Sequence, residues 1–360
     1  MVGTRIFPAK ISSAKIDVMI LLMNCVDLRE IMARPLGRSL MIVALTFLIG
    51  CAGRFPETQP PETGTYRVPT SIRFNLSNRD FLLHVPPETE PDKPLPLVVV
   101  LHGAFNTARQ TEKETGFSAR ADEEKFIVVY PEGIGIFGFL QHWSAGHCCG
   151  KAAQDNIDDL TFIDAVIAKT NSLLPIDPDR IYMAGMSNGG MLTYRYAAER
   201  GHKLAAIAAV ATPIGSRENM KTPNWTIPDA VLPLPVIAFH GTGDKHVPIE
   251  GGVSPLKKGP RSYDSYENAM NFWKSMAACQ NTPVISEADR GSVVKTDYRG
   301  CAEEIQLTFY TLKDWEHHWP APYFTTRLKP GDPLYNFDAT RLIWEFFRKH
   351  KRPNTGGVSK

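Results

Sequence analysis

The sequence lacks a surplus of basic residues over most of its length. Its first 50 residues carry six Lys or Arg against three Asp or Glu, whereas the remainder carries 34 against 35. A protein that binds nucleic acid normally presents a basic face to the phosphates. The nearly neutral remainder therefore gives a nucleic-acid partner no electrostatic support.

The apolar run near the N-terminus falls short of the roughly 20 residues that a membrane-spanning helix needs. It lies in Met32–Gly53, which has a basic start, an apolar centre and a small-residue end. These three features predict an export signal. We therefore interpret residues 1–50 as a signal region, with Met32 as a possible true start, and an uncleaved anchor is the alternative.

The predicted signal ends in "LIGC", which resembles the lipobox of bacterial lipoproteins. This ending predicts that Cys51 is lipidated and becomes the first residue of the mature chain. The proline-rich residues 51–65 would then tether the domain to its lipid. We expect membrane contact through this anchor alone, and a domain that works outside the cytoplasm, anchored to the cell envelope or secreted.

Cysteine is scarce, with six residues in 360. Two of them lie in the N-terminal region, which leaves Cys148, Cys149, Cys279 and Cys301. Export permits disulfides, and a bridge from Cys279 to Cys301 would close the short loop between a helical pattern and a strand-like run. Adjacent Cys148 and Cys149 are either a strained vicinal bridge or two buried thiols.

Internal repeats and low-complexity tracts are also absent from the region between tether and tail. Instead, short and nearly continuous apolar runs alternate with amphipathic segments, and Asp158 or Asp159 can cap one of the predicted helices. This alternation predicts a mostly parallel central sheet with helices on both faces. We expect one α/β domain over residues 66–350, followed by a flexible tail at 351–360.

One serine lies between glycines where an apolar strand pattern gives way to a helical one. The stretch from Gly185 to Gly189 reads GMSNG and matches G-x-S-x-G, whose glycines permit a sharp turn that exposes the serine oxygen. The strand before it and the helix after it are the context that the motif requires. We interpret Ser187 as a nucleophile, and a glycine-rich binding turn is the alternative.

A serine nucleophile needs an imidazole to take its proton and a carboxylate to orient that imidazole. On this kind of sheet the acid precedes the histidine along the chain. Asp244 ends the strand-like run LPVIAFHGTGD, 57 residues after the serine. It is the predicted acid, and Asp264 is a less well placed rival.

The histidine is expected in WEHHWP, just after the strand-like run EIQLTFYTL. His246 is too near the acid in sequence, and His350 lies among basic residues in the last helix. Adjacent side chains point apart in extended backbone, so one of His317 and His318 can face the serine. The pattern alone leaves the choice between them open.

Backbone N–H groups that stabilise an oxyanion are expected at two places. The strand VVVLHG ends in a glycine that lets backbone approach a ligand, so the N–H of Ala104 can join that of Asn188. His102, in the same loop, is expected to hold the loop rather than react.

The motifs LHGAFN, YPEG, WSAGHCCG, GMSNGGM, HGTGD and HHWP follow one another in an order that resembles the polyhydroxybutyrate depolymerase and feruloyl esterase-like family of α/β-hydrolases. The likeness runs from about Arg73 to Phe347. It implies the α/β-hydrolase fold, and its late His-x-Trp-Pro motif implies that His317 rather than His318 is the base. Asp314, Trp315 and Glu316 stand where family members usually have glycines.

The resemblance implies hydrolysis of a carboxyl ester through an acyl-enzyme, without a cofactor. The substrate would be a polyester, or acetyl or feruloyl groups of a polysaccharide. A metal site is disfavoured because no H-E-x-x-H or similar spacing occurs. A peptidase of the same fold would carry an additional N-terminal propeller, and a non-catalytic surface-binding lipoprotein is the remaining alternative.

An apolar wall for the substrate is expected in Gly133–Cys149, which combines glycines with Phe137, Phe139 and Trp143. Trp143 is the chief candidate for substrate contact, and Trp319 beside the late histidines is a weaker one. The alternative is that these aromatic side chains belong to the core.

Overall fold

The computed structural model describes most of the chain beyond its N-terminal region. The described residues are 53–54, 62–90, 92–136, 139–146, 148–217, 221, 224–256 and 261–352. The expected signal region, Cys51, Phe137 and most of the tether and tail lie outside these residues. The expectations for them stay predictions.

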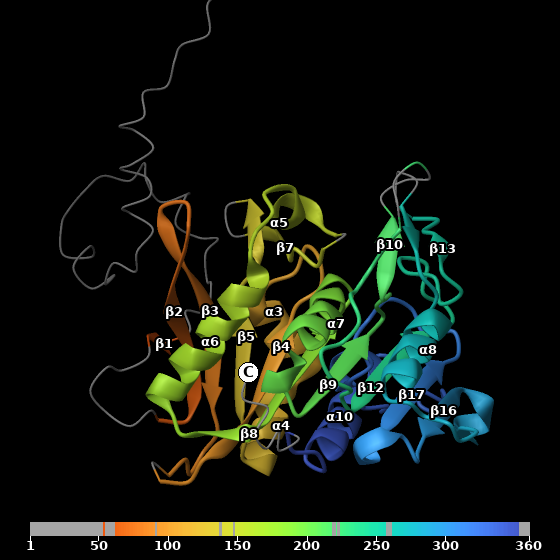
Figure 1. Cartoon of the computed structure of the whole chain (residues 1–360). Helices are drawn as coiled ribbons and strands as arrows, with labels where there is room; N and C mark the ends of the chain where they lie inside the picture. Colours follow the sequence, from red (N-terminus) through yellow and green to blue (C-terminus); the bar gives the residue numbers. More distant parts are fainter. Residues whose placement is uncertain are drawn as a thin grey trace, which may run out of the picture. The chain divides into compact units, whose positions relative to one another are not determined.

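A central sheet of eleven strands organises the described residues (Figure 1). Across the sheet the strands are, in order, β1 (Gly53–Arg54), β2 (Gly64–Phe74), β3 (Ser77–Val85), β5 (Ile127–Pro131), β4 (Leu95–Leu101), β8 (Ile176–Met186), β9 (Ala206–Val210), β12 (Val236–Gly241), β17 (Leu307–Leu312), β16 (Val293–Tyr298) and β15 (Val284–Ala288). The consecutive strands from β5 to β17 pair in parallel. Antiparallel pairs flank them on both sides. The predicted, mostly parallel sheet is thus confirmed.

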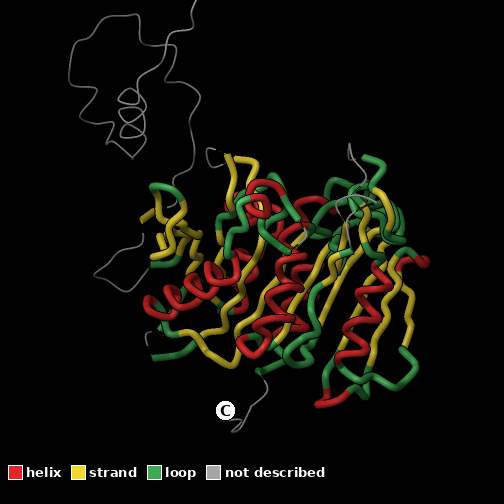
Figure 2. Tube along the Cα trace, turned by 45° about the horizontal axis from the view of Figure 1, so that its top comes forward, coloured by secondary structure: helices red, strands yellow, loops and turns green. Residues whose placement is uncertain are grey.

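Helices cover both faces of this sheet, as the alternation of patterns predicts. One face carries α6 (Asp159–Leu173), α7 (Asn188–Arg200) and α8 (Tyr266–Met276), and the other carries α3 (Ala108–Thr115), α4 (Phe117–Glu124) and α10 (Ala339–Phe347). Figure 2 shows helices lying over strands that run side by side. The α/β-hydrolase class predicted from the motifs has this arrangement.

Strand β4 shows how the sequence builds two cores. Its side chains alternate between the faces: Leu97, Val99 and Leu101 join the core under α6, α7 and α8, whereas Val98 and Val100 join the core under α4 and α10. All five are fully buried. A strand covered on both faces is therefore apolar at every position rather than at alternate ones.

Shorter elements lie around the sheet. They are α5 (Gly150–Gln154), α9 (Pro322–Thr325), the β6 (Ile134–Ile136) and β7 (Phe139–His142) hairpin, a small sheet of β11 (Trp225–Thr226), β10 (Gly215–Arg217), β14 (Ser262–Tyr263) and β13 (Gly252–Val253), and the 3₁₀ turns Gly201–Lys203, Asp289–Gly291 and Ala302–Glu304. Within the residues described above, no helix has both the length and the apolar character needed to cross a membrane.

Both remaining cysteine pairs are bonded in the structure. Cys279, just after α8, is joined to Cys301, and Cys148 is joined to its neighbour Cys149. The first pairing agrees with the bridge expected from the sequence. The second corresponds to the vicinal bridge, one of the two alternatives that the sequence left open.

Two adjacent aspartates at the start of α6 have separate roles. Asp158 is the N-cap, and its carboxylate accepts a hydrogen bond from the backbone N–H of Thr161 at 3.0 Å. Asp159 is fully buried and pairs with Arg79 of β3 at 2.7 Å. A buried ion pair therefore links α6 to the antiparallel side of the sheet.

Candidate active site

The predicted nucleophile lies on a strained turn between β8 and α7. Ser187 has φ 53° and ψ −122°, a backbone conformation that residues with a side chain rarely adopt. Gly189 is required here because a Cβ on it would collide with the carbonyl oxygens of Leu101 and His102. The serine is half-buried, so its hydroxyl is neither sealed in the core nor fully exposed.

The predicted acid and base meet at the same edge of the sheet. Asp244 follows β12 and is buried, and its Oδ2 lies 2.6 Å from Nδ1 of His317, which follows β17. Its Oδ1 accepts the backbone N–H groups of His246 and Val247, both at 2.9 Å. Parallel strands bring residues that are 73 positions apart into contact at their carboxyl ends.

The rival residues named from the sequence lie elsewhere. Asp264 accepts hydrogen bonds from Asn224 and Thr226 beside the small sheet. His318 is exposed and packs its ring 4.6 Å from that of Phe324. The structure therefore places His317, and not His318, on the carboxylate of Asp244.

The carboxylate of Asp244 is held in its ionised form. Burial alone would raise the pKa of Asp244, but the hydrogen bond and charge of His317 and the N–H of Val247 together bring this pKa below its ordinary value. An ionised carboxylate favours the tautomer of His317 that carries its proton on Nδ1. The other ring nitrogen is then left to accept a proton.

Ser187 and His317 are not joined in this structure. No hydrogen bond within the described part of the chain connects the serine hydroxyl to the imidazole, whose ring lies 5.0 Å from that of His246. Proton transfer between them therefore requires a side-chain movement, such as often accompanies substrate binding. The structure brings two of the three predicted groups into hydrogen-bond contact.

His240 is a buried histidine that the sequence reasoning did not single out. It lies on β12, and its Nε2–H donates to the carbonyl of Val247 at 2.8 Å while staying 3.6 Å from Oδ2 of Asp244. Burial lowers the pKa of His240, so the ring is neutral. This hydrogen bond fixes the turn whose N–H groups contact Asp244. The sequence signal for this role was the position of His240 as the first residue of HGTGD.

The two expected oxyanion donors belong to adjoining segments. A Cβ on Gly103 would lie 3.6 Å from the Cβ of Ser187, so the loop that carries Ala104 runs beside the nucleophile. The loop and turn hydrogen bonds of the described residues use the N–H of Phe105 but not that of Ala104 or Asn188. Donation from these two N–H groups to a substrate oxygen stays a prediction.

His102 holds this loop in place, as expected. Its Nδ1–H donates to the carbonyl of Gly103 at 2.8 Å, and its Nε2 accepts the N–H of Gly133 at 3.0 Å. Trp143 packs against the imidazole at a tilt, with ring centroids 4.7 Å apart, and donates from Nε1 to the carbonyl of His102 at 2.9 Å. The imidazole must stay neutral to make both of its own hydrogen bonds.

The side chain of Asn188 ties the nucleophile turn to the same unit. Its Oδ1 accepts the N–H of Trp143 at 2.7 Å, and its Nδ2 donates to the carbonyl of Trp143 at 3.1 Å. The next residue, Ser144, donates its N–H to Asp159 at 2.7 Å. The sequence reasoning used only the backbone of Asn188 and missed this clamp.

Trp143 and Trp319 do not reach the surface, which corrects the expectation that they contact substrate. Their exposed fractions are 0% and 1%. Trp143 supports the loop that carries the predicted oxyanion donor Ala104, which is called the oxyanion loop below. Trp319 donates from Nε1 to Thr340 at 2.9 Å while packing on Phe117. The alternative that such aromatic residues belong to the core is the right one for both.

Other apolar side chains are exposed beside the oxyanion loop. Phe105 is 64% exposed, Phe139 61% and Leu140 52%. Phe105 directly follows Ala104 and donates its N–H to the carbonyl of Gln141 at 2.8 Å, which joins it to β7. Phe139, one of the aromatic residues expected in the apolar wall, therefore does lie at the surface.

Replacing His102 by glutamine is expected to reduce the loss of stability in acid. Burial lowers the pKa of His102 to about 4, so between that value and its ordinary 6.5 the unfolded chain binds more protons than the folded one. The free energy of unfolding therefore falls as pH drops through this window, by about 3 kcal/mol for this group. His102→Gln should remove that part, as measured by urea unfolding at pH 7 and pH 4.

The control for this experiment is His202→Gln, a change of an exposed histidine after α7. This change should leave the difference in unfolding free energy between pH 7 and pH 4 as it is in wild type. If wild type and His102→Gln lost the same unfolding free energy between pH 7 and pH 4, His102 would not be held neutral by its surroundings.

The proteins that this chain resembles in sequence are named as esterases. Residues 79–215 match the family described as Esterase PHB depolymerase, a span that contains Ser187 but ends before Asp244 and His317. Feruloyl esterase B of Piromyces equi is 32% identical over 199 residues, which cover 53% of this chain and 35% of that protein. Probable feruloyl esterase C of Aspergillus terreus is 26% identical over 280 residues, covering 76% and 85%.

A solved structure supports the fold. The acetyl xylan esterase from Aspergillus awamori superposes with a TM-score of 0.50 at 15% identity, covering 71% of this chain and 94% of that one. The chain spans less than half the length of two relatives: 42% of an esterase from Nocardia uniformis subsp. tsuyamanensis, which is 31% identical, and 35% of feruloyl esterase B. The chain thus has the α/β-hydrolase fold and is similar to the polyhydroxybutyrate depolymerase and feruloyl esterase-like family, as the resemblance seen in its motifs predicts.

Proposed function

We propose that this chain is an exported serine hydrolase of carboxyl esters. The observation that carries the proposal is the 2.6 Å contact of Asp244 with His317, at the same sheet edge as a serine on a strained turn. A carboxylate–imidazole pair at the same sheet edge as a serine hydroxyl is the arrangement from which a serine is activated. The esterase relatives and the expected N-terminal signal support the same reading.

The reaction has two halves. Ser187 Oγ attacks the ester carbonyl and passes its proton to Nε2 of His317, and the N–H groups of Ala104 and Asn188 stabilise the oxyanion. Collapse of this intermediate breaks the bond to the alcohol, which leaves with the proton from His317. Water then attacks the acyl-enzyme, again losing a proton to His317. The acid is released when Ser187 regains that proton.

The acyl group is proposed to lie against the exposed apolar patch of Phe105, Phe139 and Leu140. This patch begins at the residue after Ala104, so a substrate whose carbonyl oxygen meets the oxyanion donors places its neighbouring groups close to it. Covering exposed aromatic surface favours an apolar or aromatic acyl group. No cofactor takes part in the proposed steps.

A fluorophosphonate ester tests the nucleophile directly. The phosphorus is attacked by an activated serine, so one equivalent should attach to the peptide that contains Ser187, as seen by mass spectrometry after digestion. Ser187→Ala should remain unlabelled, and Ser286→Ala, which changes an exposed serine on β15, should label like wild type. Labelling of another residue in the wild-type protein would contradict the assignment.

A further inference from the structure

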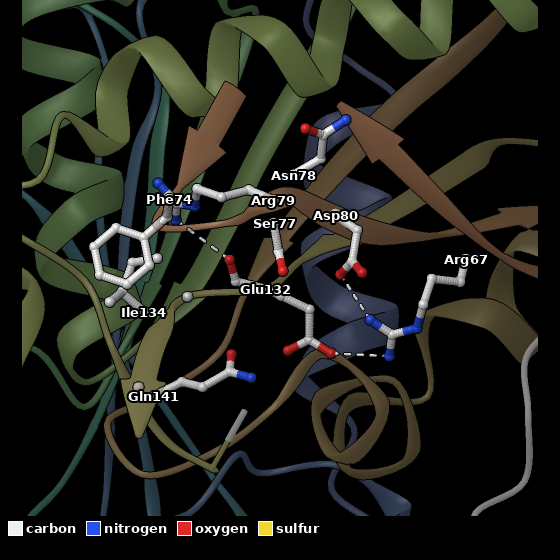
Figure 3. A pocket seen from close by; sticks show the side chains of 11 residues that line it. Arg67, Phe74, Ser77, Asn78, Arg79, Asp80, Glu132, Ile134 and Gln141 are labelled. Carbon is white, nitrogen blue, oxygen red and sulfur yellow. Dashed lines mark hydrogen bonds and ion pairs between the residues drawn. The ribbon is translucent and has the colours of Figure 1, made fainter. Parts of the chain in front are cut away.

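A cavity of about 410 Å³ lies beside the oxyanion loop and outside the groups used by the proposed mechanism. It is formed by the ends of β2 and β3 on one side and by the β6–β7 hairpin on the other. In Figure 3, Phe74, Ile134 and Gln141 lie to one side of Glu132, and Asp80 and Arg67 lie to the other. The volume falls within the range of small-molecule sites.

The charges in this cavity compensate one another. Arg67 contacts Asp80 at 2.6 Å and Glu132 at 3.2 Å (Figure 3). Arg79, the second cation of the lining, is buried and pairs with Asp159 of α6 at 2.7 Å. A ligand with a net charge would gain little here and would compete with these pairs, so the cavity suits a neutral molecule.

The lining combines hydrogen-bonding groups with apolar surface. Asn78 is an exposed amide. The carboxylate of Asp80 keeps acceptor positions besides its contact with Arg67, and that of Glu132 keeps them besides its contacts with Arg67 and the N–H of Ala108. Phe74 is a half-buried ring, and Ile134 adds a buried aliphatic side chain. A polyester segment has no donors, so it would cover these acceptors without pairing them. A sugar ring presents hydroxyls that both donate and accept and a C–H face that packs on an aromatic ring.

The wall of the cavity is bonded to the loop that carries Ala104. Gly133, a lining residue, donates its N–H to Nε2 of His102 at 3.0 Å. The carbonyl of Gln141, another lining residue, accepts the N–H of Phe105 at 2.8 Å. The cavity and the loop that carries Ala104 therefore share one hydrogen-bonded wall.

We propose that the cavity binds a neutral saccharide, the part of the substrate that carries the ester. This inference rests on the proposed function and selects acylated saccharides over polyesters as substrates. The acyl group would lie on the apolar patch, and the sugar beyond the ester would lie between Phe74 and Gln141.

Two variants test the proposal by a ratio of activities. The ratio compares kcat/KM on acetylated xylotetraose with kcat/KM on p-nitrophenyl acetate, which has no sugar. Phe74→Ala should lower this ratio about 10-fold, and Asn78→Ala about 5-fold, because each removes one contact with the sugar. The matched controls Phe272→Ala on α8 and Asn171→Ala on α6 change similarly exposed residues that do not line the cavity, and they should leave the ratio unchanged.

A binding measurement separates this proposal from the mechanism. Unesterified xylotetraose, titrated into Ser187→Ala protein by calorimetry, should bind, and the added Phe74→Ala change should weaken binding about 10-fold. Unchanged ratios, or no sugar binding, would overturn the saccharide site even if the ester hydrolysis is real. A lowered rate on a hydroxybutyrate trimer, in place of the sugar ester, would overturn it in favour of a polyester. A wild-type protein that binds the sugar but hydrolyses neither ester would refute the proposed function alone.

Discussion

Ser187→Ala is expected to lower kcat on p-nitrophenyl acetate by about 10⁴- to 10⁶-fold. The alanine removes the oxygen that forms the acyl-enzyme, so water would have to attack the substrate directly. The oxyanion donors are backbone N–H groups and remain, which leaves a residual rate above that of water alone. Initial rates of the purified domain, followed at the wavelength of nitrophenolate, measure the effect.

The fold of this variant must be intact for the result to count. Ser187 donates its backbone N–H to Val210 at 2.9 Å, and its carbonyl accepts the hydroxyl of Thr212 at 2.8 Å. Both contacts survive in alanine, so the thermal unfolding curve should match that of wild type. A rate that survives the substitution would reject the mechanism, whereas an inactive wild type would favour the non-catalytic lipoprotein.

Asp244→Asn is expected to lower kcat by about 10⁴-fold while leaving the site assembled. The amide oxygen can still accept the N–H groups of His246 and Val247. Its NH₂ group, however, would donate to Nδ1 of His317 and so force the ring proton onto Nε2, the nitrogen that must accept from Ser187. Rates on p-nitrophenyl acetate from pH 5 to pH 9 test this, and the deficit should persist at every pH where wild type is active.

The matched control is Asp264→Asn, which changes the rival acid. Asp264 contacts Asn224 and Thr226 and not His317, so its loss should alter kcat less than about threefold. If Asp264→Asn inactivated the enzyme and Asp244→Asn did not, the geometry of Asp244 and His317 would have been misread.

The lowered pKa of Asp244 also determines the pH range in which its carboxylate stops stabilising the fold. The folded pKa lies below the ordinary value of 3.8, so the unfolded chain binds this proton more readily. The stabilisation that the carboxylate contributes is therefore complete above that ordinary value and is lost as pH falls through the lower, folded one. Protonation of Asp244 therefore would not explain a loss of activity at pH 5, which would have to come from another group.

The nucleophile turn could be predicted from sequence because its determinants are local. A β-strand pattern, a serine between glycines and a helix pattern occupy about 20 consecutive residues around Ser187, and the structure has β8, the turn and α7 at these positions. The acid and histidine were predicted by a different argument. Parallel strands align their carboxyl ends, so motifs that follow successive strands must meet at one edge however far apart they are in sequence.

The aromatic residues show where sequence reasoning failed. Trp143 lies in a glycine-rich stretch after a strand, a context equally consistent with a substrate wall and with a core. It is buried because Asn188, His102 and Phe162 come from three other parts of the chain to surround it. Phe139, four residues earlier, is 61% exposed. No local pattern distinguishes the two rings.

The sequence by itself determined the fold class, the positions of the candidate serine, carboxylate and imidazole along the chain, and the resemblance to esterases, because strand and helix periodicity and short motifs are properties of neighbouring residues. Only the tertiary structure decided that Asp244 and not Asp264 meets the imidazole, that Asn188 clamps Trp143, and that a charge-compensated cavity adjoins the oxyanion loop. These features depend on which side chains distant segments bring within about 3 Å of one another, a distance at which hydrogen bonds form and desolvation decides burial.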